Sequence, residues 1–198
     1  MKKAVFEDFD GYDDIIGEIE YSRKFGVDYT QERSMPERFI NRLHPPRLRL
    51  RLGEIIEETA SAKTFRLVSE ENELPPFLAG QYISLLVETG GILTNRPYSI
   101  SSPPNQAGFW DITVRRVPSG LVSNFLLDHV KKGEILHSSG PCGNFYHNPL
   151  FHDKSIVLIA GGAGITPFMS MIREIAECGL DRHVHLFFGS KTLDRKST

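Results

Sequence analysis

The chain has 198 residues, of which 40% are hydrophobic, and its formal net charge is −2. This balance argues against a nucleic-acid partner, which requires a strong basic excess, and no apolar run approaches the roughly 20 residues of a membrane span. The N-terminus turns acidic at once and lacks the apolar core of a signal peptide, and the two cysteines form no Cys-x-x-Cys pair, so we expect a cytoplasmic protein with reduced thiols.

The first 46 residues differ in pattern from the rest of the chain. Between Asp10 and Lys24 apolar residues recur at roughly helical spacing, and Met35–Leu43 predicts a second short helix that ends before Pro45. One interpretation of residues 1–46 is a helical extension packed on the next domain. The other is a docking segment for a partner subunit or a redox protein.

From Arg47 the hydrophobic period changes to two. Leu48, Leu50 and Leu52 alternate with arginines, which indicates a strand with one buried face and one solvated row of arginines. Five further short strands are expected between turns rich in Gly and Pro, at Lys63–Ser69, Gln81–Glu88, Ile92–Ser101, Trp110–Val117 and Glu134–Ser138, and a helix at Leu121–Lys131. Six strands in this arrangement predict an antiparallel barrel over residues 47–150.

After Pro149 the pattern changes again. Ser155–Ala160 is a continuous apolar run, as in a parallel strand that is buried on both faces. A glycine-rich turn, a helix at Phe168–Cys178 closed by Gly179, and a second apolar strand at His183–Phe188 follow. This β-α-β unit predicts an incomplete Rossmann-like lobe over residues 151–198. One unit cannot close a doubly wound sheet, so we expect either a fragment of a longer protein or a lobe that a partner completes.

The motif Arg96-Pro97-Tyr98-Ser99 combines a cation, a rigid residue, an aromatic ring and a hydroxyl. In an extended chain Arg96 and Tyr98 share one face, and Pro97 and Ser99 share the other. A guanidinium suits phosphate oxygens, and a phenol ring suits a planar ring system. A flavin dinucleotide carries both groups. The alternative is an ordinary strand end with a surface arginine and a packed tyrosine.

Two further motifs favour phosphate binding. A strand ends near Val114, the chain turns at Gly120, and a helix begins whose free N–H groups attract anions, with the Ser123 hydroxyl as a further donor. Alternatively, Ser119 or Ser123 is a plain helix cap. Residues 161–167, Gly-Gly-Ala-Gly-Ile-Thr-Pro, follow a buried strand and open a helix, which is the context of a dinucleotide phosphate loop. Pro167 suits a first helical turn but replaces the last glycine of Gly-x-Gly-x-x-Gly.

Together these motifs resemble the ferredoxin–NADP reductase family. Arg96–Ser99 matches its Arg-x-Tyr-Ser/Thr flavin motif, and Gly120–Ser123 falls where the family binds the flavin diphosphate. Gly140–Phe145 resembles its Gly-Pro-x-Gly-x-Phe turn, and Gly161–Pro167 matches its pyridine-nucleotide loop. The resemblance covers about residues 48–190 and leaves residues 1–46 outside.

The resemblance implies a role for each residue. Tyr98 would stack on the isoalloxazine, Arg96 would bind the diphosphate, and Ser99 would hydrogen-bond near flavin N5, which receives hydride. Thr166 would lie near the nicotinamide, and Ser99 and Thr166 are therefore the expected catalytic residues. The expected cofactor-binding residues are Arg96, Pro97, Tyr98, Ser99, Val114, Gly120, Val122, Ser123, Gly162, Gly164, Thr166 and Pro167.

The resemblance also implies a function. A flavoprotein oxidoreductase would pass electrons from NAD or NADP in reduced form through FAD, or FMN as the alternative, to a ferredoxin, iron–sulfur or haem protein. Two other readings are a flavin-holding electron-transfer subunit of a larger complex and a non-catalytic nucleotide-binding or assembly module. The family's later Cys-Gly segment and C-terminal aromatic are not found in this chain, and some relatives append a plant-type 2Fe-2S ferredoxin domain.

The remaining titratable residues are not assigned to a site. His183 and His185 alternate on a strand but have no third ligand in view, so we expect no metal. His147 and His152 flank the interdomain linker and are interpreted as surface residues. Cys142 is interpreted as a small packed residue.

Overall fold

The computed structural model describes residues 16, 17, 20, 21, 24, 47–70, 73–106 and 108–190, and the chain divides into two compact units, Met1–Asn41 and Arg42–Thr198. The described residues of the first unit are helical and fall within Asp10–Lys24, where a helix is expected. The rest of that stretch and the predicted helix Met35–Leu43 lie outside the described residues. Among the described residues, no helix has the length and hydrophobicity needed to cross a membrane.

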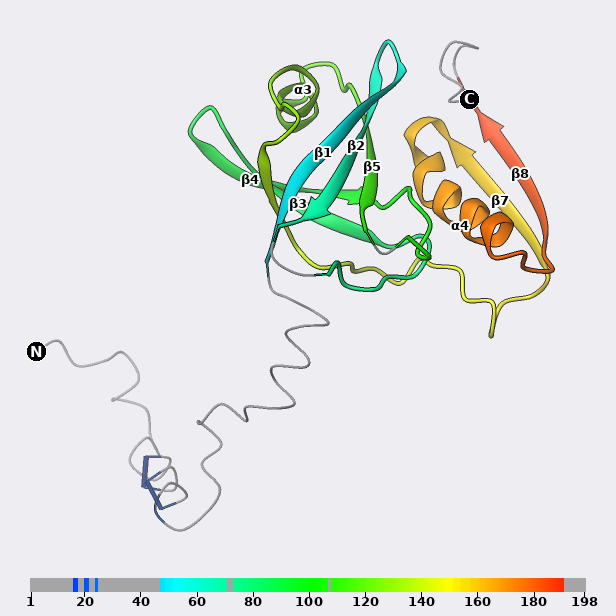
Figure 1. Cartoon of the computed structure of the whole chain (residues 1–198), viewed down its shortest axis with the longest axis horizontal. Helices are drawn as coiled ribbons and strands as arrows, with labels where there is room; N and C mark the ends of the chain where they lie inside the picture. Colours follow the sequence, from blue (N-terminus) through cyan, green and yellow to red (C-terminus); the bar gives the residue numbers. More distant parts are fainter. Residues whose placement is uncertain are drawn as a thin grey trace, which may run out of the picture. The chain divides into compact units, whose positions relative to one another are not determined.

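The second unit begins with a six-stranded antiparallel sheet (Figure 1). Its strands are β1 (Leu48–Thr59), β2 (Ala62–Ser69), β3 (Tyr82–Thr89), β4 (Ile92–Ser99), β5 (Trp110–Arg115) and β6 (Ile135–Ser138), in the spatial order β4-β3-β6-β1-β2-β5. The two end strands meet through a bridge between Ile100 and Ile112, which closes the sheet into a barrel. Helix α3 (Leu121–Asp128) lies against β3 and β5. The predicted barrel is confirmed.

The alternating pattern of β1 sets its orientation. Leu50 and Leu52 are fully buried, whereas Arg49 and Arg51 are exposed, as a period of two predicts. The strand then continues to Thr59, past the leucine pattern, through an irregularity in its pairing with β2. The other predicted strands differ from the observed ones only at their ends. The predicted helix Leu121–Lys131 ends earlier, at Asp128, because the chain turns at Gly133 (φ 94°) to enter β6.

Large apolar side chains fill the barrel and hold β5 in place. Trp110 of β5 is 1% exposed and meets the ring of Phe77 edge to face, with 6.2 Å between ring centroids. The largest fully buried side chains are Trp110, Phe65, Leu50, Leu52, Leu67, Ile83, Leu85, Ile100, Ile112, Leu126 and Val114. Because β5 contributes to this core, the free edge of β5 has a fixed position.

A buried carboxylate also secures β5 to β2. The Nε and Nη2 atoms of Arg66 donate to the two oxygens of Asp111 at 2.9 and 3.0 Å, and the Asp111 side chain is 5% exposed. The guanidinium of Arg66 lies 3.9 Å from the ring centroid of Phe109. The hydrogen bond with Asp111 holds the pKa of Arg66 above its ordinary value, so the arginine stays charged.

We expect Asp111→Asn to lower the free energy of unfolding by about 2 kcal/mol, because it removes one partner of a mostly buried, two-point ion pair and leaves the other in place. The exposed pair of Arg116 and Asp128 provides the matched control. Asp128→Asn should leave stability nearly unchanged, since solvent screens that pair. Chemical denaturation of both variants measures the difference, and equal losses would contradict this account.

The rest of the second unit is the predicted β-α-β lobe. It consists of β7 (Ser155–Gly161), the 3₁₀ turn η1 (Gly162–Ile165), α4 (Thr166–Glu177) and β8 (His183–Gly189), with β7 and β8 parallel (Figure 1). Helix α4 begins earlier than predicted and has Pro167 in its first turn, where the missing N–H costs no hydrogen bond. It closes as expected at Gly179 (φ 61°), after which the Leu180 N–H bonds to the Ile175 carbonyl at 2.9 Å.

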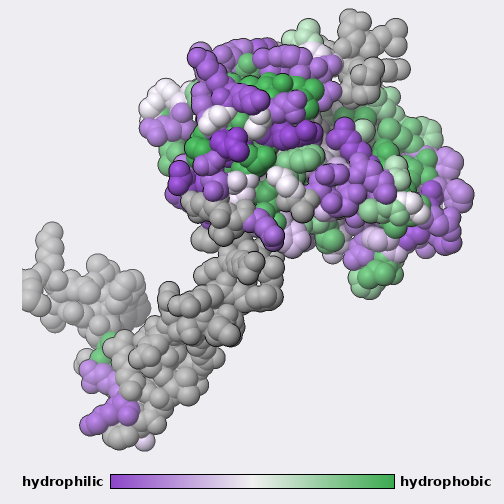
Figure 2. Space-filling model, in the orientation of Figure 1, coloured by the Kyte–Doolittle hydropathy of each residue, from purple (hydrophilic) through white to green (hydrophobic). Residues whose placement is uncertain are grey.

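The expectation that Ser155–Ala160 is buried on both faces is wrong for the described part of the chain. Leu158 packs in the cluster beneath α4, but Val157 and Ile159 are 60% and 75% exposed. Phe187 of β8, which pairs with Ile159, is 62% exposed. Figure 2 shows hydrophobic surface on this lobe. Helix α4 covers one face of this apolar strand, and no described element covers the other face.

Helix α4 is fastened to the barrel by polar contacts. The Ser170 hydroxyl donates to the Ser102 carbonyl at 2.7 Å, and Nη1 of Arg173 donates to the Ser101 carbonyl at 3.0 Å. Both acceptors belong to the segment that follows β4. The lobe therefore has a defined position next to the strand that carries the Arg-Pro-Tyr-Ser motif.

Candidate functional site

The barrel has an opening where β4 and β5 diverge. The two strands meet at the bridge between Ile100 and Ile112, and beyond it the described residues show no further pairing between them. Val114 turns its side chain into the core and pairs with β2. Alternate residues of an antiparallel strand direct their backbone groups to opposite sides, so Thr113 and Arg115 present theirs to the opening. A flat ligand with donors and acceptors along one edge could pair with this strand edge.

Arg96 and Tyr98 lie on one face of β4, as the alternation predicts. Arg96 is exposed, and its Nη1 donates to the Thr94 hydroxyl at 3.0 Å and to the Asn95 carbonyl at 2.6 Å. These contacts hold the guanidinium along its own strand. Its other N–H groups make no hydrogen bond within the described part of the chain, which leaves donors for an anionic ligand.

The phenol of Tyr98 is half-buried against the barrel core. Burial raises the pKa of this phenol, and the charge of Arg96 opposes that rise in smaller measure, so the ring is neutral at physiological pH. Ser99 ends β4, and its hydroxyl makes no hydrogen bond to any described residue. Pro97, between Arg96 and Tyr98, has no N–H to donate. The strand end therefore offers a ring on one face and a hydroxyl on the other.

The turn before α3 is compact. A Cβ at Gly120 would lie 2.5 Å from the Ser123 hydroxyl oxygen and 2.9 Å from the Val117 Cβ, so only glycine fits there. Ser123 is buried and accepts a hydrogen bond from the Val117 N–H at 3.2 Å, and Ser119 adopts a φ of 57°. Neither serine caps the helix. With Val122 packed in the core, the turn presents backbone N–H groups and the Ser123 hydroxyl proton to an anion.

The turn at Gly140–Phe145 joins the end of the barrel to the lobe. Cys142 exchanges both backbone hydrogen bonds with Tyr82, at 3.0 and 2.9 Å. Phe145 meets Phe168 of α4 edge to face, with 5.6 Å between ring centroids. Cys142 is thus held by its backbone, and this motif acts as a connection between the two parts.

The glycine-rich loop leads from β7 through η1 directly into α4. Gly162 has a φ of 54°, and no atom lies within 4 Å of the position that a Cβ on Gly164 would take. A ligand can therefore approach the loop backbone closely. The Thr166 hydroxyl donates to the Ala163 carbonyl at 2.9 Å, which places it at the exposed start of α4.

Sequence reasoning missed Arg115, whose guanidinium lies over this loop. A Cβ on Gly162 would come within 2.7 Å of the Arg115 Nη1. The guanidinium makes no hydrogen bond or ion pair within the described part of the chain, whereas Arg116 bonds twice to Asp128, at 2.8 and 2.5 Å. A cation without an acceptor, beside loop amides and a helix start, suits an anionic group. The available signal was alternation, since Val114 faces inward and Arg115 must face outward.

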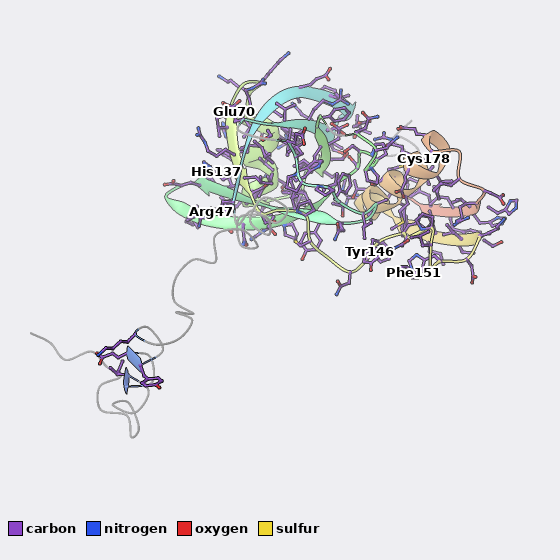
Figure 3. The ribbon with its side chains drawn as sticks, turned by 60° about the horizontal axis from the view of Figure 1, so that its bottom comes forward. Arg47, Glu70, His137, Tyr146, Phe151 and Cys178 are labelled. Atoms are coloured by element: carbon purple, nitrogen blue, oxygen red, sulfur yellow. The ribbon has the colours of Figure 1, made fainter. Side chains whose placement is uncertain are left out.

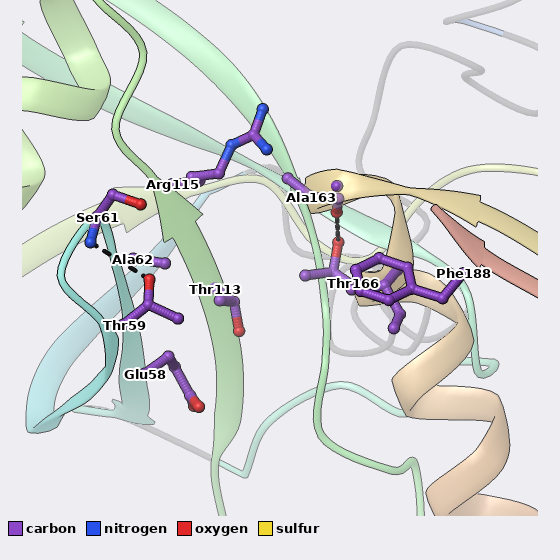
Figure 4. A pocket seen from close by; sticks show the side chains of 11 residues that line it. Glu58, Thr59, Ser61, Ala62, Thr113, Arg115, Ala163, Thr166 and Phe188 are labelled. Atoms are coloured by element: carbon purple, nitrogen blue, oxygen red, sulfur yellow. Dashed lines mark hydrogen bonds between the residues drawn. The ribbon is translucent and has the colours of Figure 1, made fainter. Parts of the chain in front are cut away.

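A cavity of about 490 Å³, part of it open to solvent, lies between the β1–β2 hairpin, β5 and the glycine-rich loop (Figure 4). Its lining residues are Glu58, Thr59, Ser61, Ala62, Thr113 and Arg115 from the barrel, and Gly162, Ala163, Ile165, Thr166 and Phe188 from the lobe. Figure 4 shows Arg115 reaching from the end of β5 toward Ala163, with Thr166 beyond. The end of β5 therefore borders both the opening and the loop.

The two linker histidines differ in environment. His147 is not a surface residue, contrary to the interpretation from sequence: its side chain is 3% exposed, and its Nδ1 lies 3.5 Å from Oε2 of Glu174. His152 is exposed, as expected. Within the described residues, no group of three His, Cys, Asp or Glu side chains is arranged to hold a metal ion.

Comparison with protein families assigns both parts of the second unit. Residues 48–147 match the oxidoreductase FAD-binding domain, and residues 158–196 match the oxidoreductase NAD-binding domain. The chain belongs to the ferredoxin reductase-like family of FAD- and NAD-dependent oxidoreductases. Both matched segments of this family coincide with the barrel and the lobe.

Three similar family members show the range of relatives. The glycine betaine monooxygenase reductase subunit of Pseudomonas aeruginosa (strain UCBPP-PA14) is 40% identical over 124 residues, which are 63% of this chain and 34% of that protein. The flavohemoprotein of Bacillus thuringiensis subsp. konkukian (strain 97-27) is 36% identical over 137 residues, which cover 65% of this chain and 34% of that protein. Phthalate dioxygenase reductase, a solved structure, has a TM-score of 0.69 at 28% identity, and the match covers 76% of this chain and 46% of that one. The chain spans about a third of the length of the curated relatives it matches.

The residues present fit the cofactors of this family. FAD requires a cation for its diphosphate, a surface for its ring system and hydrogen-bonding groups along the ring edge. Arg96, Tyr98 and the backbone of Thr113 supply these around one opening. A Cβ would fill the tight turn at Gly120, and another would meet the guanidinium over Gly162, so both turns require glycine.

Proposed function

We propose that this chain forms the flavin-binding barrel and nucleotide lobe of a reductase that takes electrons from NADH or NADPH and passes them to a redox protein. The observation that carries the proposal is the shared border at the end of β5. Arg115 ends β5, beyond the bridge that joins Ile112 to Ile100 after β4, and its guanidinium lies over Gly162. Two cofactors bound in these places would have their reactive ends close together, as hydride transfer requires.

On the flavin side, Arg96 and the start of α3 hold the diphosphate, Tyr98 stacks on the ring system, and Ser99 donates a hydrogen bond to the ring edge. Val114 is a core side chain whose backbone groups face β2, so the backbone of its neighbour Thr113 takes its expected place at the opening. Val122 is also a core side chain and contributes its backbone only. The proposed flavin contacts are Arg96, Pro97, Tyr98, Ser99, Thr113, Gly120, Val122 and Ser123. When bound, FAD accepts a hydride and can release its electrons singly.

On the nucleotide side, Gly162, Gly164 and Pro167 shape the loop that receives the diphosphate, and Arg115 adds a cation to it. Thr166 stands at the start of α4 with its hydroxyl exposed. We propose that it orients the nicotinamide toward the flavin ring, while Ser99 holds the ring from the other side. Both NADH and NADPH are compatible with these contacts.

The acceptor that we propose is an iron–sulfur or haem protein. Phthalate dioxygenase reductase is described as transferring electrons from pyridine nucleotides to 2Fe-2S, and two relatives are a monooxygenase reductase subunit and a flavohemoprotein. A ferredoxin is the simplest such partner. We place the reaction in the cytoplasm, which agrees with Cys142 and Cys178 forming no disulfide.

An absorbance spectrum followed by anaerobic addition of NADH and NADPH tests this function. The purified protein should show an oxidised-flavin band near about 450 nm, and the preferred nucleotide should bleach it. Transfer to an added 2Fe-2S ferredoxin then tests the acceptor. A preparation that stays colourless after incubation with FAD would refute the flavin site, and a yellow preparation that neither nucleotide bleaches would indicate a nucleotide-binding module without catalysis.

Gly162→Ala should weaken NAD⁺ or NADP⁺ binding about tenfold and leave FAD content unchanged, because the added methyl group would be strained at this φ and would displace the Arg115 guanidinium from the loop. Gly179→Ala is the matched control, with a similar φ of 61° and no atom within 4 Å. It should bind the nucleotide as the wild type does. Titration of each flavin-loaded variant with nucleotide measures its dissociation constant. Similar constants for Gly162→Ala and Gly179→Ala would show that the loop is not part of the nucleotide site.

A further inference from the structure

The junction between the lobe and the barrel holds a buried acid–base pair that the proposed function does not use. Ser170 and Arg173 bind backbone carbonyls of the barrel. Glu174, next to them on α4, faces His147 of the linker instead. In Figure 3, Tyr146 and the exposed Phe151 mark this linker between the barrel and the lobe.

The side chains of His147 and Glu174 are buried, and several of their polar atoms lack a hydrogen bond. The side chains of His147 and Glu174 are 3% and 15% exposed, and both ring nitrogens of His147 and Oε2 of Glu174 are buried without a hydrogen bond. The 3.5 Å between Nδ1 and Oε2 is too long for a good hydrogen bond. Yet the linker backbone is firmly placed here, because the His147 N–H donates to the Ala79 carbonyl at 2.9 Å. Unsatisfied groups at a well-packed junction call for an explanation.

The surrounding groups do not neutralise the pair. The His152 ring lies 5.9 Å from the His147 ring, tilted by 36°, and the Tyr146 ring lies 6.5 Å from that of His152. Arg182 gives both Nη atoms to backbone carbonyls. Burial raises the pKa of Glu174, and His147 alone opposes that rise. His147 is therefore the partner on which the charge of Glu174 depends within the junction.

We propose that His147 and Glu174 form a proton-operated latch that positions the nucleotide lobe on the barrel. With one proton between them the pair has no net charge, and its two facing atoms share a hydrogen bond. Removal of that proton to solvent leaves a carboxylate charge in a buried place. The closed junction therefore binds the proton more tightly than an opened one, so closure is favoured at lower pH and weakens as pH rises through the titration of the pair.

The sign agrees with the direction of the Glu174 pKa. A carboxyl whose pKa is raised in the closed state stabilises that state below its ordinary pKa, and this contribution is lost as pH rises through the raised value. In the proposed reductase, hydride transfer would accordingly slow toward alkaline pH as the lobe loosens. That consequence depends on the proposed function, but the latch itself does not.

Hydrogen exchange of the His147 backbone amide tests the latch, because that amide bonds across the junction to Ala79. In the protein as purified, protection corrected for intrinsic exchange should fall about tenfold as pH rises through the ionisation of Glu174, whose pKa burial raises above its ordinary value. In Glu174→Gln the protection should be the same at both pH values. His152→Gln, which alters the neighbouring exposed histidine, should keep the wild-type dependence.

Retention of the wild-type pH dependence in Glu174→Gln would overturn the proposal. If that variant does not fold, the side-chain carboxyl carbon NMR shift of Glu174 in the wild type decides instead. It should change over the same pH range in which protection falls, and protection that stays constant through the ionisation of Glu174 would equally overturn the latch. Neither readout uses a nucleotide or electron transfer, so a failure here is distinct from a failure of the proposed function.

Discussion

Arg96→Ala should weaken FAD binding about a hundredfold, which is the largest effect on binding that we expect from one side chain. The guanidinium offers free N–H donors beside Tyr98, and each charge-assisted hydrogen bond to a phosphate contributes roughly 1.5–3 kcal/mol. Two such bonds at the lower end of this range, lost without replacement, correspond to about this factor. Stability should change little, because Arg96 is exposed and bonds only to its own strand. Fluorescence titration of the apoprotein with FAD measures the dissociation constant.

Arg51→Ala is the matched control for this variant. Arg51 is an exposed arginine of the same barrel, and its Nε donates to Glu70 at 2.8 Å on the outer side of β1. It should bind FAD as the wild type does. The FAD affinity of Arg96→Lys should lie between those of Arg96→Ala and Arg51→Ala, since lysine keeps the charge but lacks the planar guanidinium. Unchanged FAD affinity in Arg96→Ala would show that the diphosphate lies elsewhere.

Local signals predicted most of the fold. The alternation of Leu50 and Leu52 with arginines gave the buried face of β1, because side-chain direction in a strand follows a period of two. Glycine and proline predicted the turns, because each allows or restricts the backbone conformation at its own position. Pro167 can occupy a first helical turn, and Gly162 can adopt a φ of 54° that other residues avoid. These patterns did not give the order of the strands in the sheet, and they placed the start of α4 later than Thr166, where it begins.

Contacts between distant segments were not predictable from such patterns. The sequence around His147 gave no sign that the ring is enclosed by α4, since Glu174 lies far along the chain. Arg115 and Arg116 are adjacent in sequence, and only the structure shows that Arg115 approaches Gly162 whereas Arg116 bonds to Asp128. The exposure of Ile159 was not predictable either, because an apolar strand sequence does not indicate how many faces of the strand are covered.

Two of these cases, His147 and Arg115, lie where the lobe meets the barrel. A site formed between two folded parts depends on how they dock, and docking is set by surface residues whose partners are far away in sequence. The flavin motif, by contrast, lies within β4 and the turn before α3, and both are local features. The sequence therefore predicted the flavin side of the site in more detail than the nucleotide side.

Gly80→Ala should lower the free energy of unfolding by roughly 3 kcal/mol or more, since it combines backbone strain with a clash in a packed junction. Gly80 has a φ of 107°, and a Cβ there would come within 2.5 Å of both the Phe145 carbonyl oxygen and the Met171 Cε. The methionine end can move aside, but the carbonyl belongs to the backbone of the turn that joins the barrel to the lobe. Relief of the clash must therefore push α4 away from the barrel.

Gly91→Ala separates the two causes. Gly91 also has a positive φ, 73°, but nothing lies within 4 Å of the position of its Cβ. Gly91→Ala should lower the free energy of unfolding only by the backbone strain, about 1 kcal/mol, and should leave the junction intact. Denaturation of both variants gives the two free energies, and hydrogen exchange locates the loss, which for Gly80→Ala should concentrate in α4 and residues 79–82. If both variants lose the same free energy, contact at the junction contributes nothing, and the lobe would not be held against the barrel by the packing around Gly80.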